Sequence, residues 1–108
     1  MAMVQAVITF GASAKQLFAG LPAGAEVRKL RVEPLRGNSH VSYVGDSTVT
    51  NDGSGVGVIQ ELAQPPAATL PVDAYEDKAE GGRNTVDASI LYGHGTSGEH
   101  LVVTYWTL

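Results

Sequence analysis

Ser47 is the first candidate for chemistry in this sequence, because it ends a Gly45-Asp46-Ser47 triplet that follows an apolar run. One large class of serine esterases presents its nucleophile in such a triplet. A serine is activated only beside a positioned base, and none of the three histidines follows the Asp-x-x spacing with which these enzymes supply it. We therefore interpret Gly45 and Asp46 as turn residues and Ser47 as the start of the next strand, and we predict no catalytic residue.

The three histidines are the candidate metal ligands. His40, His94 and His100 form neither a His-x-His nor a His-x₃-His pair. His94 and His100 flank one predicted hairpin, so the fold could bring them together. Two ligands without a carboxylate as the third do not make a zinc-type site, and we predict no metal-binding residue.

Acidic and glycine-rich segments complete the candidates. The acidic clusters lack the ligand spacing of a calcium loop, and a glycosidase-type pair of carboxylates cannot be recognised from spacing alone. The segment GHGTSG, residues 93–98, joins two predicted strands, whereas a phosphate cradle uses the N-terminus of a helix. We therefore predict no cofactor. The acidic clusters are Glu76-Asp77 with Glu80, and Asp46 with Asp52.

The charge balance argues against nucleic acid as a partner. The chain of 108 residues has a net charge of −4, and phosphate binding requires a basic stripe. Arg28, Lys29 and Arg31 form a local basic cluster flanked by Glu26 and Glu33, which we interpret as the solvated face of a strand. We also expect no membrane partner, because no run approaches about 20 apolar residues, and no secretory signal, because a basic n-region is missing.

The elements that must position these residues are short strands. Thirteen glycines and five prolines favour many turns over long helices. One short N-terminal helix is expected over residues 13–20, where Ser13 and Gln16 form a capping-box pattern. The sequence predicts a single all-β domain over residues 1–108, a small antiparallel β-sandwich or jelly roll of about eight strands. The expected strands span residues 3–10, 26–35, 40–44, 47–50, 56–62, 68–75, 85–92 and 99–106.

The strand expected over residues 26–35 has an irregular hydrophobic phase. Val27 lies on one face and Leu30 on the other. A bulge near Arg28 or Lys29 would repair this phase. The segment that follows residue 75 is expected to be a charged surface loop over residues 76–84.

The interface candidates lie near both ends of the sequence. Residues 1–14 carry no charged side chain, and we expect residues 1–12 to form either a strand or an arm added to a neighbour's sheet edge. Tyr105 and Trp106 alternate on the last strand, so one of them faces inward and the other is exposed or covered by a partner. The predicted interface residues are Val4, Ala6, Ile8, Phe10, Tyr105 and Trp106.

A longer pattern of strands and turns resembles that of small virion proteins of tailed bacteriophages. It consists of VRKLRVEPLRGNSHVSYVGDSTVT with a glycine-rich turn after it, and later DASILYGHGTSGEHLVVTYW. The likeness extends over about residues 27–106 and rests mostly on turn glycines and strand residues, while TLPVDAY matches only in part. Among virion proteins the chain resembles head decoration or cement proteins, and this resemblance implies a compact β-sandwich or jelly-roll module that sits on the capsid.

The resemblance implies a non-enzymatic structural protein that binds and stabilises the phage coat lattice. Its expected partners are the major capsid protein and further copies of itself, as a dimer or trimer. It would be made in the host cytoplasm and lie on the outer surface of the capsid in the virion. A tail or head–tail completion protein, which forms a ring, is the alternative within the virion. A carbohydrate- or receptor-binding β-sandwich is the alternative of another class, and it predicts an exposed aromatic platform that includes Tyr43, Tyr92 or Trp106.

Overall fold

The computed structural model describes residues 3–18, 26–35, 38–50, 57–63, 74–78 and 86–107. In these residues every regular element is a β-strand, which confirms the all-β class. No helix in this part of the chain is long and apolar enough to cross a membrane. The strands are β1 (Met3–Thr9), β2 (Lys15–Gln16), β3 (Glu26–Val27), β4 (Lys29–Pro34), β5 (Ser42–Gly45), β6 (Val58–Leu62), β7 (Tyr75–Lys78), β8 (Val86–Asp87), β9 (Tyr92–His94) and β10 (His100–Trp106).

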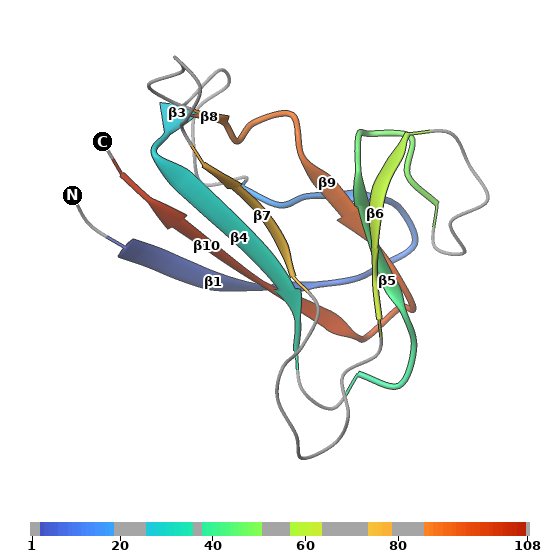
Figure 1. The fold of residues 1–108 in the computed structure, drawn as a ribbon. Coiled ribbons are helices and arrows are strands. Elements are labelled where there is room, and N and C mark those ends of the chain that lie inside the picture. Colours follow the sequence, from blue (N-terminus) through green and yellow to red (C-terminus); the bar gives the residue numbers. More distant parts are fainter. Residues whose placement is uncertain are drawn as a thin grey trace.

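The strands form two four-stranded sheets and one two-stranded pair (Figure 1). Sheet A has the order β1-β10-β4-β7, sheet B has the order β2-β9-β5-β6, and β3 pairs with β8. All these pairings are antiparallel. β10 lies inside sheet A, where it pairs with β1 on one side and with β4 on the other, both without a register shift. The two sheets are therefore built from strands that are far apart in the sequence.

Side chains from both sheets share one hydrophobic core. Leu30 and Leu101 of sheet A and Val44 and Leu62 of sheet B are fully buried in the same cluster. Burial alternates residue by residue along β4, which is the two-residue period of a strand with one covered face. The arrangement is that of a β-sandwich, with the core between the sheets and no cysteine in the sequence to link them.

The structure does not show the helix expected over residues 13–20. Of this segment it describes residues 13–18, in which β2 pairs with β9. The backbone N–H of Leu17 donates to the carbonyl of Leu91 at 3.0 Å, and both Leu17 and Phe18 are buried. A capping-box pattern contributes little to a helix of about two turns, so sheet pairing and burial of two adjacent apolar side chains decide the structure here.

Residues 46–49 form a turn, so the strand expected over residues 47–50 is wrong. Gly45, which is predicted to be a turn residue, belongs to β5. The N–H of Val49 donates to the carbonyl of Asp46 at 3.1 Å, which closes a β-turn. Asp46 Oδ1 also accepts hydrogen bonds from the Thr48 N–H at 2.8 Å and from the Thr48 hydroxyl at 2.6 Å. This side-chain turn competes with strand pairing, and the chain enters sheet B again only at β6.

The irregular phase near Arg28 has a structural cause. Val27 belongs to β3, which pairs with β8, whereas Leu30 belongs to β4 in sheet A. Arg28 lies between them, and its N–H donates to the carbonyl of Trp106 at 2.9 Å. The bulge expected near Arg28 or Lys29 is therefore wrong, because the chain instead breaks at Arg28 and passes from one sheet to another.

The later strands differ from their expected boundaries. The strand expected over residues 85–92 is divided into β8 and β9 by a turn. Residues 76–78, which were expected in a charged loop, belong to β7 and pair with β4. The remaining parts of the segments expected over residues 68–75 and 76–84 lie outside the described residues.

Candidate interaction surface

β1 is an edge strand of sheet A whose two faces are both exposed. Only Ile8 is half-buried, and the other six residues are exposed. Five large hydrophobic side chains are exposed in the described part of the chain, and three of them are on β1: Met3 at 60%, Val4 at 39% and Val7 at 56%. Figure 1 shows the Met3 end of β1 directed away from sheet B. Apolar exposure concentrated in one strand is typical of a surface that contacts a partner.

β1 belongs to the fold of its own chain. All seven of its residues are in register with β10, from Met3 opposite Trp106 to Thr9 opposite His100. Within the segment 1–12, residues 3–9 therefore form a strand of sheet A. Its outer edge, however, has no partner among the described residues.

The outer face of sheet A carries the side chains that alternate with the core positions. The strand register arranges them in rows, and Gln5, Thr104 and Arg31 share one row. In this row the Nε2 of Gln5 donates to the Thr104 hydroxyl at 3.1 Å. Apolar side chains lie mainly on β1 and β10, and charged ones on β4 and β7. The outer face consists of Met3, Gln5, Val7, Thr9, Lys29, Arg31, Glu33, Glu76, Lys78, His100, Val102, Thr104 and Trp106.

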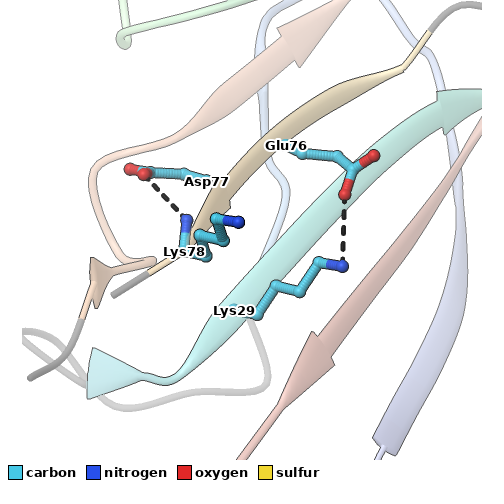
Figure 2. Close-up of a pocket in the computed structure, with 4 residues that line it drawn as sticks. All are labelled: Lys29, Glu76, Asp77 and Lys78. Carbon is cyan, nitrogen blue, oxygen red and sulfur yellow. Dashed lines mark hydrogen bonds and ion pairs between the residues drawn. The ribbon is translucent and has the colours of Figure 1, made fainter. Parts of the chain in front are cut away.

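Glu76 is the centre of an ion-pair network on the β4–β7 side of this face. Its carboxylate oxygens lie 3.3 Å from Lys29 Nζ and 3.0 Å from Arg31 Nη1. Arg31 Nη2 also lies 3.4 Å from Glu33 Oε2. Figure 2 shows Lys29 and Glu76 pointing toward one another across the two strands. Because two cations meet two carboxylates, this part of the face presents little net charge to a partner, and exposed pairs of this kind contribute about 0–1 kcal/mol each.

An open pocket lies beside this network and is lined by Lys29, Glu76, Asp77 and Lys78 (Figure 2). Asp77 Oδ1 accepts the N–H of Lys78 at 2.9 Å. The two lysines and two carboxylates balance, so the pocket favours neither an anionic nor a cationic ligand. The sequence gives no signal for the role of Glu76, because its charged surroundings predict a loop there.

Tyr105 and Trp106 face opposite sides of β10, as their alternation predicts. Tyr105 packs against the core, and its ring meets that of Phe18 edge-on with centroids 5.9 Å apart. Trp106 is half-buried on the outer face, where Lys29 Nζ lies 4.9 Å from the ring centroid. This cation–π contact joins the apolar and charged parts of the outer face.

The predicted interface residues divide between the surface and the core. Val4 and Ala6 are exposed on β1. Ile8, like Tyr105, is half-buried and packs against the core cluster. Phe10 is 3% exposed and belongs to that cluster. Of this set, the exposed apolar surface therefore comes from β1 itself.

Met3 and Val7 are exposed residues that the sequence pattern did not single out. They share a face of β1 with Gln5 and Thr9, because side chains two apart lie on the same side of a strand. Two polar residues on this face made it resemble the solvated side of an ordinary strand. The signal that could have identified it was the absence of any charge on either face.

Ser47 is exposed in the turn, and the hydrogen bonds between its neighbours Asp46 and Thr48 hold that turn. Hydrogen bonds from the Thr48 hydroxyl and then from the Thr48 N–H lower the pKa of Asp46. Asp46 is thus used to hold the backbone. Asp52 and Glu80, the other members of the acidic clusters, lie outside the described residues.

The three histidines have different surroundings. His94 is on β9 of sheet B and His100 is on β10 of sheet A. No group of three or more His, Asp or Glu side chains is arranged to hold a metal ion within the described ranges. The Nδ1 atoms lie 3.3 Å from Glu99 Oε2 in His40, 3.1 Å from the Val49 carbonyl in His94, and 2.9 Å from the Thr9 hydroxyl in His100.

Glu99 ties the segment before β5 to the start of β10. Its carboxylate accepts the N–H of Ser39 at 2.6 Å and the N–H of His40 at 3.1 Å. Burial by itself would raise the pKa of Glu99, but these hydrogen bonds and the His40 ring outweigh burial, so the pKa is lowered. Asn38 reinforces the link, because its side chain donates to the His100 carbonyl at 2.7 Å and accepts the His100 N–H at 3.1 Å.

Gly93 and Gly95, two of the three glycines in the 93–98 segment, allow close packing. A Cβ on Gly93 would lie 2.7 Å from a Leu17 methyl carbon and 2.8 Å from one of Leu101. A Cβ on Gly95 would lie 2.6 Å from the ring of Phe10. The absence of side chains at these two positions lets the core close over the backbone, whereas Gly98 adopts a φ of +90° with open space around it.

Of the three aromatic residues that would form a carbohydrate platform, Tyr43 and Tyr92 share a face of sheet B, whereas Trp106 lies on sheet A. Tyr43 is buried. Tyr92 is half-buried on β9 of sheet B, and Trp106 is half-buried on β10 of sheet A. The surface with the strongest apolar character remains β1 and the adjoining outer face of sheet A.

Comparison of the chain with protein-family models, with curated proteins and with solved structures finds no match. The candidate surface is therefore interpreted from its geometry. It combines an exposed apolar strand with a charge-balanced row of side chains on one sheet face. Such a combination suits contact with a protein surface.

Proposed function

We propose that this protein is a structural virion protein that decorates a tailed-phage capsid, binding the major capsid protein on its outer surface and stabilising the lattice. The observation that carries the proposal is the apolar exposure of β1, at Met3, Val4 and Val7. Single exposed hydrophobic residues are ordinary, whereas several on one edge strand form a patch that a partner protein covers. The β-sandwich with jelly-roll connections that the resemblance implies is part of the same proposal.

Binding to a repeated capsid lattice would stabilise a protein of this size. A chain of 108 residues buries a limited core, and a small domain gains stability when its folded form binds a partner. A capsid repeats one site many times, so an oligomer of the module gains avidity from modest contacts. The outer face of sheet A offers apolar contact along β1 and β10 and ion-paired side chains around Glu76.

The two alternative functions require different features of the surface formed by β1 and the outer face of sheet A. A tail or head–tail completion protein would use the same exposed strand to form a closed ring, so its isolated form would have the mass of that ring. A carbohydrate-binding module needs an open aromatic face. It has less support, because Tyr43 is buried and Lys29 lies over the ring of Trp106.

Cosedimentation with coat shells tests the proposal. Shells are assembled from the major capsid protein of the same genome in the absence of this chain, mixed with the purified protein and pelleted. We expect the protein to pellet with the shells and to saturate at a fixed number of copies per coat subunit. A protein that remains in the supernatant at every concentration contradicts the proposal.

Val7→Lys and Ile59→Lys form a matched pair of variants for this experiment. Val7 is 56% exposed on β1 and Ile59 is 54% exposed on β6, an edge strand of sheet B. We expect Val7→Lys to weaken shell binding by at least about tenfold, because a charge within an apolar contact is desolvated, and Ile59→Lys to bind like the native protein. Equal binding by all three proteins would contradict a contact through β1.

A further inference from the structure

The free edge of β1 is unprotected. Among the residues that the structure describes, β1 pairs with β10 on one side only, so alternate residues direct their N–H and C=O groups outward, away from β10. Natural edge strands are usually blocked by charge, proline, a bulge or short length. β1 has none of these features, because its seven residues read MVQAVIT and keep one register with β10.

The other described edge strands carry such protection. β7, at the opposite edge of sheet A, has the sequence YEDK with three charged residues. In sheet B, β2 has two residues, and β6 contains Glu61 and pairs with β5 through a register shift. Compared with β2, β6 and β7, β1 is therefore the edge strand whose open edge is apolar.

The sequence of β1 is complementary to itself in antiparallel order. A two-fold axis perpendicular to the sheet at Ala6 places Ala6 opposite Ala6 of a second copy, and Val4 opposite Ile8. Directly opposite residues share a face in an antiparallel pair, so these apolar side chains lie together on the core side. The small side chain of Ala6 leaves room for them at the centre, and no like charges meet. The remaining pairs are Gln5 with Val7 and Met3 with Thr9.

We propose that two copies of this chain pair antiparallel through β1 and form one continuous sheet in the order β7-β4-β10-β1-β1-β10-β4-β7. The contact is isologous, because the same strand serves on both sides of the two-fold axis. It joins the two outer faces of sheet A and brings the Val7 side chains of both copies near the centre of the joined face. The inference goes beyond the proposed function, because the pairing requires no coat protein.

The expected strength follows from the size of the contact. Two seven-residue strands with their side chains bury a total area on the order of 1,000 Å², at the low end for a specific interface. Such contacts correspond to weak association, so we expect a monomer–dimer transition between roughly 1 and 100 µM. Analytical ultracentrifugation of the native protein over this range measures the transition directly. A monomer at every concentration, or a larger closed ring, would overturn the proposal.

Charge substitutions at Ala6 test the register. We expect Ala6→Lys alone and Ala6→Glu alone to be monomeric at concentrations where the native protein is a dimer, because like charges directly opposite one another are destabilising. An equimolar mixture of the two variants should recover the dimer, which a merely structural role of Ala6 does not explain. Ile59→Lys, on an exposed position of sheet B, is the matched control and should dimerise like the native protein. Failure of the mixture to dimerise would contradict this register.

A cysteine variant tests the same strand register without a charge at position 6, and it therefore remains informative if the charged variants do not fold. The chain has no cysteine, so Ala6→Cys introduces a single thiol. Opposite residues of paired strands have Cα atoms about 4.5–5.5 Å apart, within the range that a disulfide spans. We expect Ala6→Cys to form a covalent dimer under mild oxidation at least about tenfold faster than Ile59→Cys. Equal rates would show that Ala6 does not lie at a two-fold axis.

The proposed dimer and the proposed capsid function can each be refuted without refuting the other. A native protein that is monomeric in ultracentrifugation but pellets with coat shells would refute the dimer alone. A dimer that never pellets with shells would refute the decoration function alone. Ala6→Lys measured in both experiments also shows whether shell binding depends on the dimer.

Discussion

Gly45 is the last residue of β5 and directly precedes the turn that Asp46 and Val49 close. Its φ is not positive, since the positive-φ glycines among the described residues are Gly57 and Gly98. A Cβ on Gly45 would instead overlap the Gly57 carbonyl oxygen, which accepts the N–H of Asp46 at 3.0 Å. This contact lies at the register shift between β5 and β6, as in a β-bulge. Glycine is required at position 45 by the approach of another backbone.

A comparison of Gly45→Ala with Ser47→Ala tests this role. We expect Gly45→Ala to lower the free energy of unfolding by about 3 kcal/mol, because the closely packed backbone at Gly57 must shift to admit the methyl group. Ser47 is exposed, so Ser47→Ala should change the free energy of unfolding by less than about 0.5 kcal/mol. Urea denaturation of both variants measures the difference. A Gly45→Ala protein as stable as the native one would contradict the close backbone approach.

Glu99 makes stability depend on pH. Its pKa is lowered in the folded state, so its contribution is present above its unfolded value of about 4.3 and is lost as the pH falls through the lower folded value. At pH 7 we expect Glu99→Gln to be about 1 kcal/mol less stable than the native protein, because a charged acceptor of the Ser39 and His40 N–H groups is replaced by a neutral one.

The pH dependence of this stability difference shows whether the negative charge of Glu99, and not only the size of its side chain, stabilises the folded state. The gap between the native protein and Glu99→Gln should narrow as the pH is lowered below about 4.3, where Glu99 itself becomes protonated. Glu61→Gln, on an exposed position of β6, is the control and should show a smaller gap at pH 7. A gap that does not change with pH would contradict a role for the Glu99 charge.

At the scale of elements, β2 depends on burial rather than on local preference. Leu17 follows β2 and is buried against Gly93 and Leu101. We expect Leu17→Ala to lower the free energy of unfolding by about 3 kcal/mol, within the range for buried leucines. Lys15→Ala, on an exposed position of β2, should have little effect. A small loss for Leu17→Ala in urea denaturation would show that this segment is not part of the core.

Strands with clear alternation could be predicted from the sequence. β1, β4 and β10 lie within predicted strands, because each alternates or is rich in β-branched residues over at least six positions. β2 and the β3–β8 pair have two residues per strand, and such pairs are stabilised by distant partners rather than by a local pattern. The capping-box pattern at Ser13 and the charges of β7 therefore indicated the wrong element.

The candidate surface could be predicted in part. The uncharged start of the sequence indicated an apolar contact strand, and the structure leaves Val4 and Ala6 exposed on β1. The strand order could not be inferred, because the edge position of β1 depends on its pairing with β10 at the other end of the sequence. For the same reason the burial of Phe10 and the exposure of Met3 were not foreseen.

At the scale of the whole molecule, sheet A combines the two proposed contacts. Its β1 edge would receive a second copy, and the outer faces of both copies would form one surface. Because a ligand or partner that binds only the folded state stabilises it, we expect the thermal midpoint of the native protein to rise with its concentration over roughly 1–100 µM. The midpoint of Ala6→Lys should not rise in this way, and differential scanning calorimetry measures both. A concentration-independent midpoint for the native protein would contradict self-association.

Thermal disruption of coat shells with and without this protein tests most directly whether the protein stabilises a capsid. Shells that lack the protein are heated alone and after saturation with it, and light scattering reports their disassembly. Because a protein that binds only the assembled lattice stabilises it, we predict that bound shells come apart at a higher temperature and that the increase stops at a fixed ratio of protein to coat subunit. Shells that come apart at the same temperature at every ratio would contradict the proposal that this protein cements a capsid.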